Sequence, residues 1–354
     1  MPEARRRSHR ALLGVLVLLL AVLAGAGGYW ALAREYAAPG PASATVRVTV
    51  VRGEALRAVL AQLAALGAVR HPREVELYVR LRRLQPRIEV GVYDIPAYAS
   101  PAQIMRMFAA GRVVLDRFTV VEGATFAEFL RELDAQPDIV PTLRGASDAA
   151  VMSALGHPGQ NPQGRFFPDT YQFSPGTLDL TVLRIAYDKM SQTLAQVWAG
   201  RSPGLPFDTP YEALILASVI EKETGVPGER TRIAGVFVNR LRRGMRLQSD
   251  PTVIYGLGAR YDGTIHTRDL TTDTPYNTYT RTGLPPTPIC LPGLASLHAA
   301  VHPANTDDLY FVATGTGGHH FSATLAGHDL ELRRYLRQLR VNRATARHKK
   351  EAHP

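Results

Sequence analysis

The sequence predicts an α+β protein with a single transmembrane helix at its N-terminus. Three observations lead to this prediction: an uncharged apolar run at residues 11–33, short strand-like and helix-like segments over residues 46–121, and a larger mixed region over residues 122–335. Within the larger region, residues 245–292 carry few helical signals but several aromatic residues. Because ordered loops of such length usually have a function, we expect a long loop-rich groove there.

The first segment has the composition of a membrane anchor. Residues 1–10 carry a cluster of arginines, and residues 11–33 reach the length of about 20 apolar residues that spans a bilayer as a helix. Basic flanks stay cytoplasmic, so we expect the rest of the chain on the far side of the membrane. A cleaved signal peptide is the alternative, since residues 24–26 resemble a small-residue cleavage site. The apolar run continues through Tyr29 and Trp30, which favours a retained anchor.

A linker and a small unit follow the anchor. Residues 34–45 include a run rich in Pro, Gly, Ala and Ser, which predicts a linker. Strand-like and helix-like segments come next, at residues 46–50, 55–66, 73–84, 102–110 and 113–121. We therefore expect a small β-α-α-β-like unit over residues 46–121, separate from the region after it.

The larger region, residues 122–335, alternates helical patterns with turn-rich stretches. Helices are expected at residues 126–133, 183–198, 211–224 and 229–242, and a strand at residues 309–313. After this region, residues 336–354 form an arginine- and lysine-rich segment, which we interpret as a solvated basic tail.

Composition narrows the classes of function. The formal net charge of +10 favours anionic partners, but no basic cluster interleaved with aromatic residues occurs, so we do not expect nucleic-acid binding. The single cysteine, Cys290, excludes an intrachain disulfide and a multi-cysteine metal site. His319, His320 and His328 lack the spacing of a metalloprotease motif, and no phosphate-loop or dinucleotide fingerprint occurs. The sequence therefore predicts neither a metal nor a cofactor.

The strongest chemical signal lies at the end of the apolar helical run 211–224. Burial disfavours the charged form of an acid, so a carboxyl group held against this surface can stay protonated near neutral pH and act as a general acid. Glu221 and Glu223 are the candidates, and two residues correspond to about 200° of helix rotation, so they point to opposite sides. Periodicity does not choose between them. For either one, the structural alternative is a carboxylate paired with an arginine such as Arg240.

Two loop stretches carry amide, carboxylate and phenol groups. The candidate binding residues are Gln248, Asp250 and Tyr255 in the first stretch, and Tyr276, Asn277 and Tyr279 in the second. Aromatic faces beside amide and hydroxyl groups suit a sugar ring. The same residue types also serve turns, so the residues alone leave both interpretations open.

Longer motifs resemble those of a known family. They are GRFFPDTY at 164–171, ASVIEKET at 217–224, VFVNRL at 236–241, MRLQSDPTVIYG at 245–256, YNTY at 276–279, GLPP at 283–286, HPA at 302–304 and LYFVA at 309–313. The chain resembles membrane-bound endolytic murein transglycosylases (MltG-type, YceG-like) from about residue 45 to residue 335. Residues 46–121 occupy the position of that family's LysM-like module, with a looser match. Cys290 and His320 depart from the family pattern.

The resemblance implies a mechanism. Glu221 matches the single glutamate that cleaves the bond between N-acetylmuramic acid (MurNAc) and N-acetylglucosamine (GlcNAc), leaving a 1,6-anhydro-MurNAc end. The catalytic domain would comprise residues 122–335, with Glu223, Gln248, Asp250, Tyr255, Tyr276, Asn277 and Tyr279 holding sugar and peptide groups.

The resemblance also implies a place of action. The protein would be a single-pass bacterial inner-membrane protein with a periplasmic catalytic domain. It would need no metal or cofactor, would cut nascent glycan strands and would terminate their elongation. A peptidoglycan synthase is the candidate protein partner.

Two rival functions come from other classes. A non-catalytic peptidoglycan-binding scaffold would keep the aromatic groove and tolerate loss of Glu221. A pyridoxal-phosphate lyase would need a Schiff-base lysine, for which Lys222 is the candidate. Binding and cleavage assays of a Glu221 variant test the first rival, and a colourless purified protein would count against the second.

Overall fold

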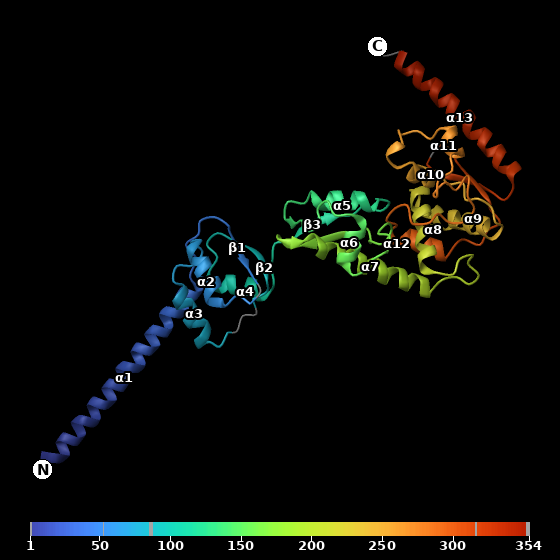
Figure 1. Cartoon of the computed structure of the whole chain (residues 1–354). Coiled ribbons are helices and arrows are strands. Elements are labelled where there is room, and N and C mark those ends of the chain that lie inside the picture. Colours follow the sequence, from blue (N-terminus) through green and yellow to red (C-terminus); the bar gives the residue numbers. More distant parts are fainter. Residues whose placement is uncertain (1, 52, 85–87, 316, 352–354) are drawn as a thin grey trace. The chain divides into compact units, whose positions relative to one another are not determined.

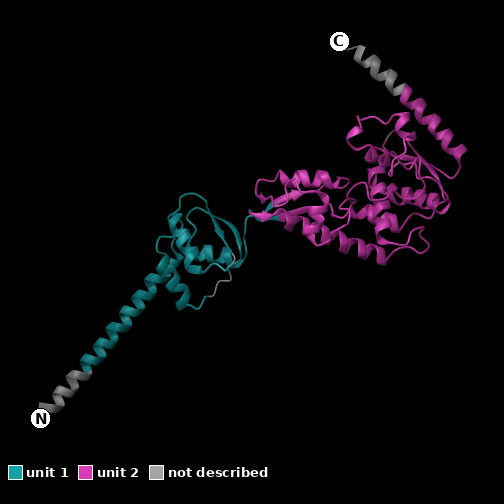
Figure 2. Ribbon diagram, viewed as in Figure 1, with its two compact units in different colours: residues 1–116, 173–175 teal, residues 117–172, 176–354 magenta. Residues whose placement is uncertain are grey.

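The computed structural model describes residues 2–51, 53–84, 88–315 and 317–351, which form a mixed α+β structure (Figure 1). The chain divides into two compact units (Figure 2). Unit 1 comprises residues 1–116 with 173–175, and unit 2 comprises residues 117–172 with 176–354.

Unit 1 begins with the long helix α1 (Pro2–Ala37). Its segment Leu12–Ala37 is long and apolar enough to cross a membrane, and the protein buries none of the most apolar part. The helix continues past residue 33 into the expected linker, because Tyr36 packs on Tyr78 with ring centroids 4.6 Å apart. The irregular stretch before the first strand is therefore shorter than we expected.

The rest of unit 1 packs helices against a two-stranded antiparallel sheet. The strands are β1 (Val46–Val50) and β2 (Gly91–Ile95), and the helices are α2 (Leu56–Ala65), α3 (Pro72–Leu81) and α4 (Pro101–Ala109). Tyr93 and Phe108 meet edge to face in the core, with centroids 4.7 Å apart. The strand expected at residues 113–121 is shorter, β3 (Asp116–Thr119), and it pairs with β5 (Thr170–Phe173).

Unit 2 contains short strands among many helices. The strands are β4 (Ile139–Val140), β5 (Thr170–Phe173), β6 (Thr177–Leu178), β7 (Tyr310–Ala313) and β8 (His319–Ser322). The α-helices are α5 (Phe126–Asp134), α6 (Asp148–Leu155), α7 (Asp179–Ala199), α8 (Pro210–Glu223), α9 (Arg230–Arg242), α10 (Asp250–Leu257), α11 (Thr267–Thr271), α12 (Leu294–Val301) and α13 (Leu325–Glu351). Two 3-10 turns, η1 (Pro227–Glu229) and η2 (Gly258–Arg260), complete the unit.

The stretch at residues 245–292 is more helical than we expected. It contains α10 and α11, and α10 begins directly after Ser249 with Pro251 in its first turn. A serine followed by such a proline is a helix-start signal that the sequence did contain.

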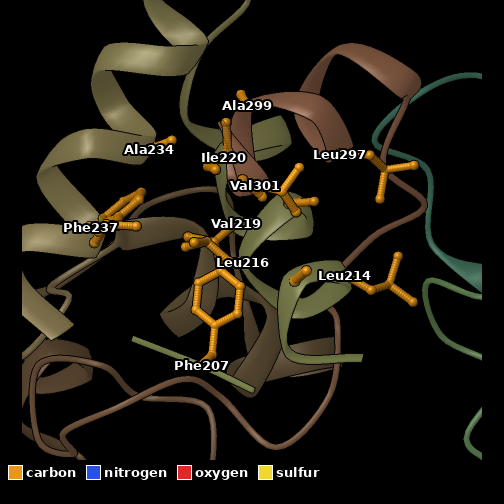
Figure 3. Packing of buried hydrophobic residues seen from close by; sticks show 14 of the residues in the cluster. Phe207, Leu214, Leu216, Val219, Ile220, Ala234, Phe237, Leu297, Ala299 and Val301 are labelled. Carbon is orange, nitrogen blue, oxygen red and sulfur yellow. The ribbon is translucent and has the colours of Figure 1, made fainter. Parts of the chain in front are cut away.

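Helix α8 lies at the centre of unit 2. Every residue from Ala213 to Ile220 is buried, because α7, α9 and α12 pack around it. Figure 3 shows Leu216, Val219 and Ile220 among side chains of α9 and α12. An all-round apolar helix is stable only in such a core. A capping box between Thr209 and Glu212 starts the helix, and its last turn carries Glu221 and Glu223 out of the apolar core.

Candidate active site

Glu221 is buried at the end of α8, and its side chain is 6% exposed. The backbone N–H of Gly293 donates to Glu221 Oε2 at 3.0 Å, and the guanidinium of Arg230 donates to Glu221 Oε1 at 3.4 Å. Arg230 is held in turn by the hydroxyl of Ser296, at 3.2 Å from its Nε. The carboxyl group thus sits where α8, α9 and the N-terminus of α12 meet.

A second carboxyl group, which sequence reasoning missed, lies close by. Glu122 belongs to the turn before α5. Its carboxyl group fills the space beside Gly293, because a Cβ atom added to Gly293 would lie only 1.9 Å from Oε1 of Glu122. Burial and the charge of Glu221 raise the pKa of Glu122, whereas Arg230 lowers it. The sequence signal was only a Glu-Gly pair closing a predicted strand, far along the chain from Glu221.

Glu223 points away from Glu221, as the helical rotation predicted. Its carboxyl group accepts a hydrogen bond from the hydroxyl of Ser249. The residue as a whole is partly exposed, but the carboxyl group is enclosed. This burial raises the pKa of Glu223 to about 7, and the charge of Asp250 adds to the rise, while the Ser249 bond and the charge of Arg240 oppose it.

Arg240 is not simply the ion-pair partner that the structural alternative describes. Its guanidinium donates to the backbone carbonyls of Leu309 (2.6 Å), Leu247 (2.8 Å) and Arg246 (3.2 Å), and to the amide oxygen of Gln248 (3.2 Å). Arg240 therefore connects α9 to Leu309, the residue before β7, and to the loop before α10, and its charge also acts on Glu223.

A cavity of about 170 Å³ opens beside Glu223. Four predicted binding residues line it, namely Glu223, Gln248, Asp250 and Tyr279, together with Arg240, Leu247 and Phe311. The phenol of Tyr279 donates to Asp250 Oδ1 at 2.6 Å. Glu221 is not among the residues that line this cavity, so the two glutamates of α8 lie in different surroundings.

The remaining predicted binding residues have structural contacts. The rings of Tyr255 and Tyr276 meet at 4.8 Å, and burial raises the pKa of Tyr255 to about 12. The phenol of Tyr276 lies 2.9 Å from the hydroxyl of Thr287. The Asn277 amide donates to three loop carbonyls and its oxygen accepts from the N–H of Tyr279, so Asn277 holds its loop in place.

Two other sequence candidates have clear positions. The ammonium of Lys222 is exposed and donates to the carbonyl of Gly123 at 3.3 Å, which is not the enclosed environment of a Schiff-base lysine. His319 Nδ1 lies 2.7 Å from Glu229 Oε2, linking β8 to η1.

Comparison with known proteins gives consistent results. The model of the YceG-like family matches residues 48–334. The endolytic murein transglycosylase of Bacillus subtilis is 28% identical over 309 residues, which cover 82% of this chain and 85% of that protein. The protein of the same name from Streptococcus pneumoniae strain D39 is 25% identical over 348 residues, covering 88% of this chain but only 62% of the pneumococcal one.

A solved structure is also similar. The crystal structure of a YceG-like protein from Listeria monocytogenes superimposes with a TM-score of 0.52 at 26% identity. The match covers 80% of this chain and 98% of that one.

Proposed function

Because the chain belongs to the YceG-like family, we propose that it is an endolytic peptidoglycan lytic transglycosylase that cleaves the MurNAc–GlcNAc bond within glycan strands. Relatives from Bacillus subtilis and Streptococcus pneumoniae bear the name endolytic murein transglycosylase. The observation that carries the proposal is Glu221, a carboxyl group 6% exposed at the end of an apolar helix, inside a segment that resembles the family's acid-bearing motif.

The reaction needs one proton donor and an internal nucleophile. The carboxyl of Glu221 donates its proton to the glycosidic oxygen as the bond to the MurNAc anomeric carbon breaks and positive charge develops on that sugar. The 6-hydroxyl of the same MurNAc then attacks the anomeric carbon, and the Glu221 carboxylate takes the hydroxyl proton. Ring closure outcompetes water because the nucleophile is held within the substrate. The products are a 1,6-anhydro-MurNAc end and a free GlcNAc 4-hydroxyl.

In this proposal the polar residues around Glu223, whose cavity Glu221 does not line, hold sugar or peptide groups of the substrate. Gln248, Asp250 and Tyr279 face one cavity, and the amide, carboxylate and phenol groups suit the hydroxyl and amide groups of the substrate. Tyr255 and Tyr276 add aromatic surface, while Asn277 keeps the loop in shape. We place the catalytic domain at residues 122–335 and a LysM-like module at residues 46–121.

The N-terminal helix bears on where the enzyme acts. An exposed apolar segment at Leu12–Ala37 suits a single-pass anchor, and the basic residues before it would stay cytoplasmic. The catalytic domain would then cut newly made strands beside the inner membrane and end their elongation, close to a peptidoglycan synthase.

The test uses the full-length chain in detergent micelles with uncrosslinked glycan strands. Mass spectrometry of the products should find internal fragments with 1,6-anhydro-MurNAc ends. In the Glu221→Gln variant the rate should fall by roughly 10² to 10⁴-fold, the typical contribution of a general acid. The exposed Glu132, on α5, offers the matched control Glu132→Gln, which should cleave like wild type.

Two results would contradict the proposal. Reducing ends in place of anhydro ends would indicate a hydrolase that uses water. Wild-type protein that binds strands without cutting them would favour the alternative function, a non-catalytic peptidoglycan-binding scaffold of the wall-synthesis machinery.

A further inference from the structure

The turn that carries Glu122 is fixed against the segment before α12. The N–H of Gly123 donates to the carbonyl of Leu291 at 2.9 Å, and the N–H of Leu291 donates to the carbonyl of Ala124 at 2.7 Å. A Cβ on Gly123 would stand 3.9 Å from Cγ of Glu221, so the turn also contacts the end of α8. Glu122 is thereby held beside Glu221 by backbone contacts.

Gly293 lies between the two carboxyl groups. Its N–H donates to Glu221 Oε2 at 3.0 Å, and the space of its missing side chain is occupied by the carboxyl of Glu122. With standard backbone geometry, these contacts place Oε2 of Glu221 and Oε1 of Glu122 no more than about 7.5 Å apart.

The charged groups around this pair do not neutralise it. Arg230 contacts Glu221 and acts on Glu122, so one guanidinium faces two carboxyl groups. The charge of Lys222 acts on Glu128, another acid of the neighbourhood. Burial and the charge of Glu221 raise the pKa of Cys290, whose neutral thiol donates to the carbonyl of Ser218.

A negative charge on Glu221 therefore disfavours a second negative charge on Glu122. Glu221 receives two donors, which bind a carboxylate more strongly than an acid. Burial and then the charge of Glu221 raise the pKa of Glu122, so Glu122 releases its proton at a higher pH than an ordinary glutamate does.

We propose that Glu122 and Glu221 form a proton-sharing carboxyl pair, in which Glu122 is a positioning residue that helps the site keep one proton to a higher pH than Glu221 alone would. The proton passes to Glu221 when the glycosidic oxygen accepts it, and the pair regains a proton from the attacking 6-hydroxyl. The catalytic role of this proton rests on the proposed function; the sharing of it does not.

The sharing is tested without substrate. Full-length chain labelled with carbon-13 at the glutamate carboxyl carbons is titrated by NMR, and Glu122→Gln and Glu221→Gln spectra assign the two signals. Glu122 should titrate above the usual glutamate range in wild type, and Glu221→Gln should lower its pKa. A Glu122 titration that Glu221→Gln leaves unchanged would overturn the proposal.

The catalytic role is tested by the pH dependence of cleavage. In Glu122→Gln the alkaline limb of the kcat profile should move to lower pH by about one to two units, the size expected for one like charge at this separation. KM should change little, and activity at acid pH should persist. Glu122→Asp should restore part of the alkaline limb, and Glu132→Gln should leave the whole profile unchanged.

Gly293→Ala provides a second variant that keeps both carboxyl groups. Its backbone has an ordinary φ of −77°, and the three atoms nearest to the new methyl group all belong to the flexible end of the Glu122 side chain, which would be displaced. It should move the alkaline limb as Glu122→Gln does. A uniform loss at every pH in both variants, or an unchanged profile, would overturn the catalytic role.

Failure of the proposed function gives a different pattern. If wild-type protein cuts no strands but Glu221→Gln changes the titration of Glu122, the carboxyl pair is supported and the proposed lytic activity is contradicted. If strands are cut with anhydro ends but Glu221→Gln leaves the titration of Glu122 unchanged, the lytic activity is supported and the carboxyl pair is contradicted.

Discussion

At the residue scale, the two glutamates of α8 differ because of what surrounds each one. Glu221 receives hydrogen bonds from Gly293 and Arg230, while Glu223 is enclosed and receives one from Ser249. Their opposite directions follow from helix rotation alone, but the partners come from segments far along the chain. Two identical side chains on one helix therefore differ in their hydrogen-bond partners because different segments pack against each of them.

The enclosed Glu223 makes stability depend on pH. Its pKa is raised to about 7 in the folded protein, whereas a glutamate of the unfolded chain has a pKa near its ordinary value of 4.5. The folded state therefore holds a proton that the unfolded state releases. Its contribution to stability is fully present below pH 4.5 and is lost as the pH rises to about 7.

We expect Glu223→Gln to remove this dependence. The amide of glutamine is neutral at every pH. The free energy of unfolding of the variant should therefore lack a decrease on the order of 3 kcal/mol that wild type shows between pH 4.5 and 8. Thermal unfolding of full-length protein at pH 5 and pH 8 measures the effect. The fall in Tm between the two pH values should be smaller in Glu223→Gln than in wild type, with Glu132→Gln behaving like wild type. Equal falls in all three proteins would contradict this prediction.

At the scale of elements, the buried side chain of Arg240 connects α9 to the segments that pack beside it. Arg240 is 7% exposed and its guanidinium satisfies the carbonyls of Leu309, Leu247 and Arg246. Arg240 also lines the cavity beside Glu223, so the same guanidinium stabilises the fold and forms part of the candidate binding site. A planar guanidinium suits this role better than a single ammonium.

Arg240→Lys should therefore destabilise the protein although charge is kept. A lysine cannot reach all three carbonyls, and each buried acceptor left without a donor costs about 1–3 kcal/mol. Chemical denaturation should give a free energy of unfolding lower by at least about 1–2 kcal/mol. Arg243→Lys, at the exposed end of the same helix, is the matched control and should unfold like wild type. A stability unchanged in Arg240→Lys would show that solvent replaces the lost donors.

At the scale of the whole molecule, a basic segment at residues 5–10 precedes the exposed apolar segment Leu12–Ala37, and the rest of unit 1 and all of unit 2 follow that segment along the chain. The single cysteine, Cys290, is fully buried, so an added cysteine would be the reactive one among the described side chains. This arrangement permits a direct test of topology.

Cysteines placed on either side of the helix should differ in access. In spheroplasts, a membrane-impermeant maleimide should label Ser43→Cys but not Ser8→Cys, and both should be labelled after the membrane is opened. The unaltered chain should stay unlabelled. Labelled Ser43→Cys protein shortened by loss of the first residues would favour the cleaved signal peptide, and labelled Ser8→Cys in intact spheroplasts would contradict the orientation.

Much of the element structure was accessible from sequence. N-cap signals and apolar periodicity predicted α4 and α5, apolar patterns predicted α8 and α9, and the motifs predicted the family, which is confirmed. The prediction missed α10, although Ser249 and Pro251 signal its start, because the surrounding turn residues dominated the pattern. It also did not assign β2 as the partner of β1, because strand pairing depends on contacts between distant segments.

The sequence by itself determined the apolar N-terminal helix, the apolar helical character of α8 and the opposite directions of Glu221 and Glu223. Each of these follows from hydrophobicity and rotation along a few consecutive residues. The tertiary structure alone decided that Glu122, Gly293 and Arg230 surround Glu221, and that Ser249 encloses Glu223. Such neighbours come from separate loops and helices, and only the packing of these elements, which no local pattern encodes, brings their side chains together.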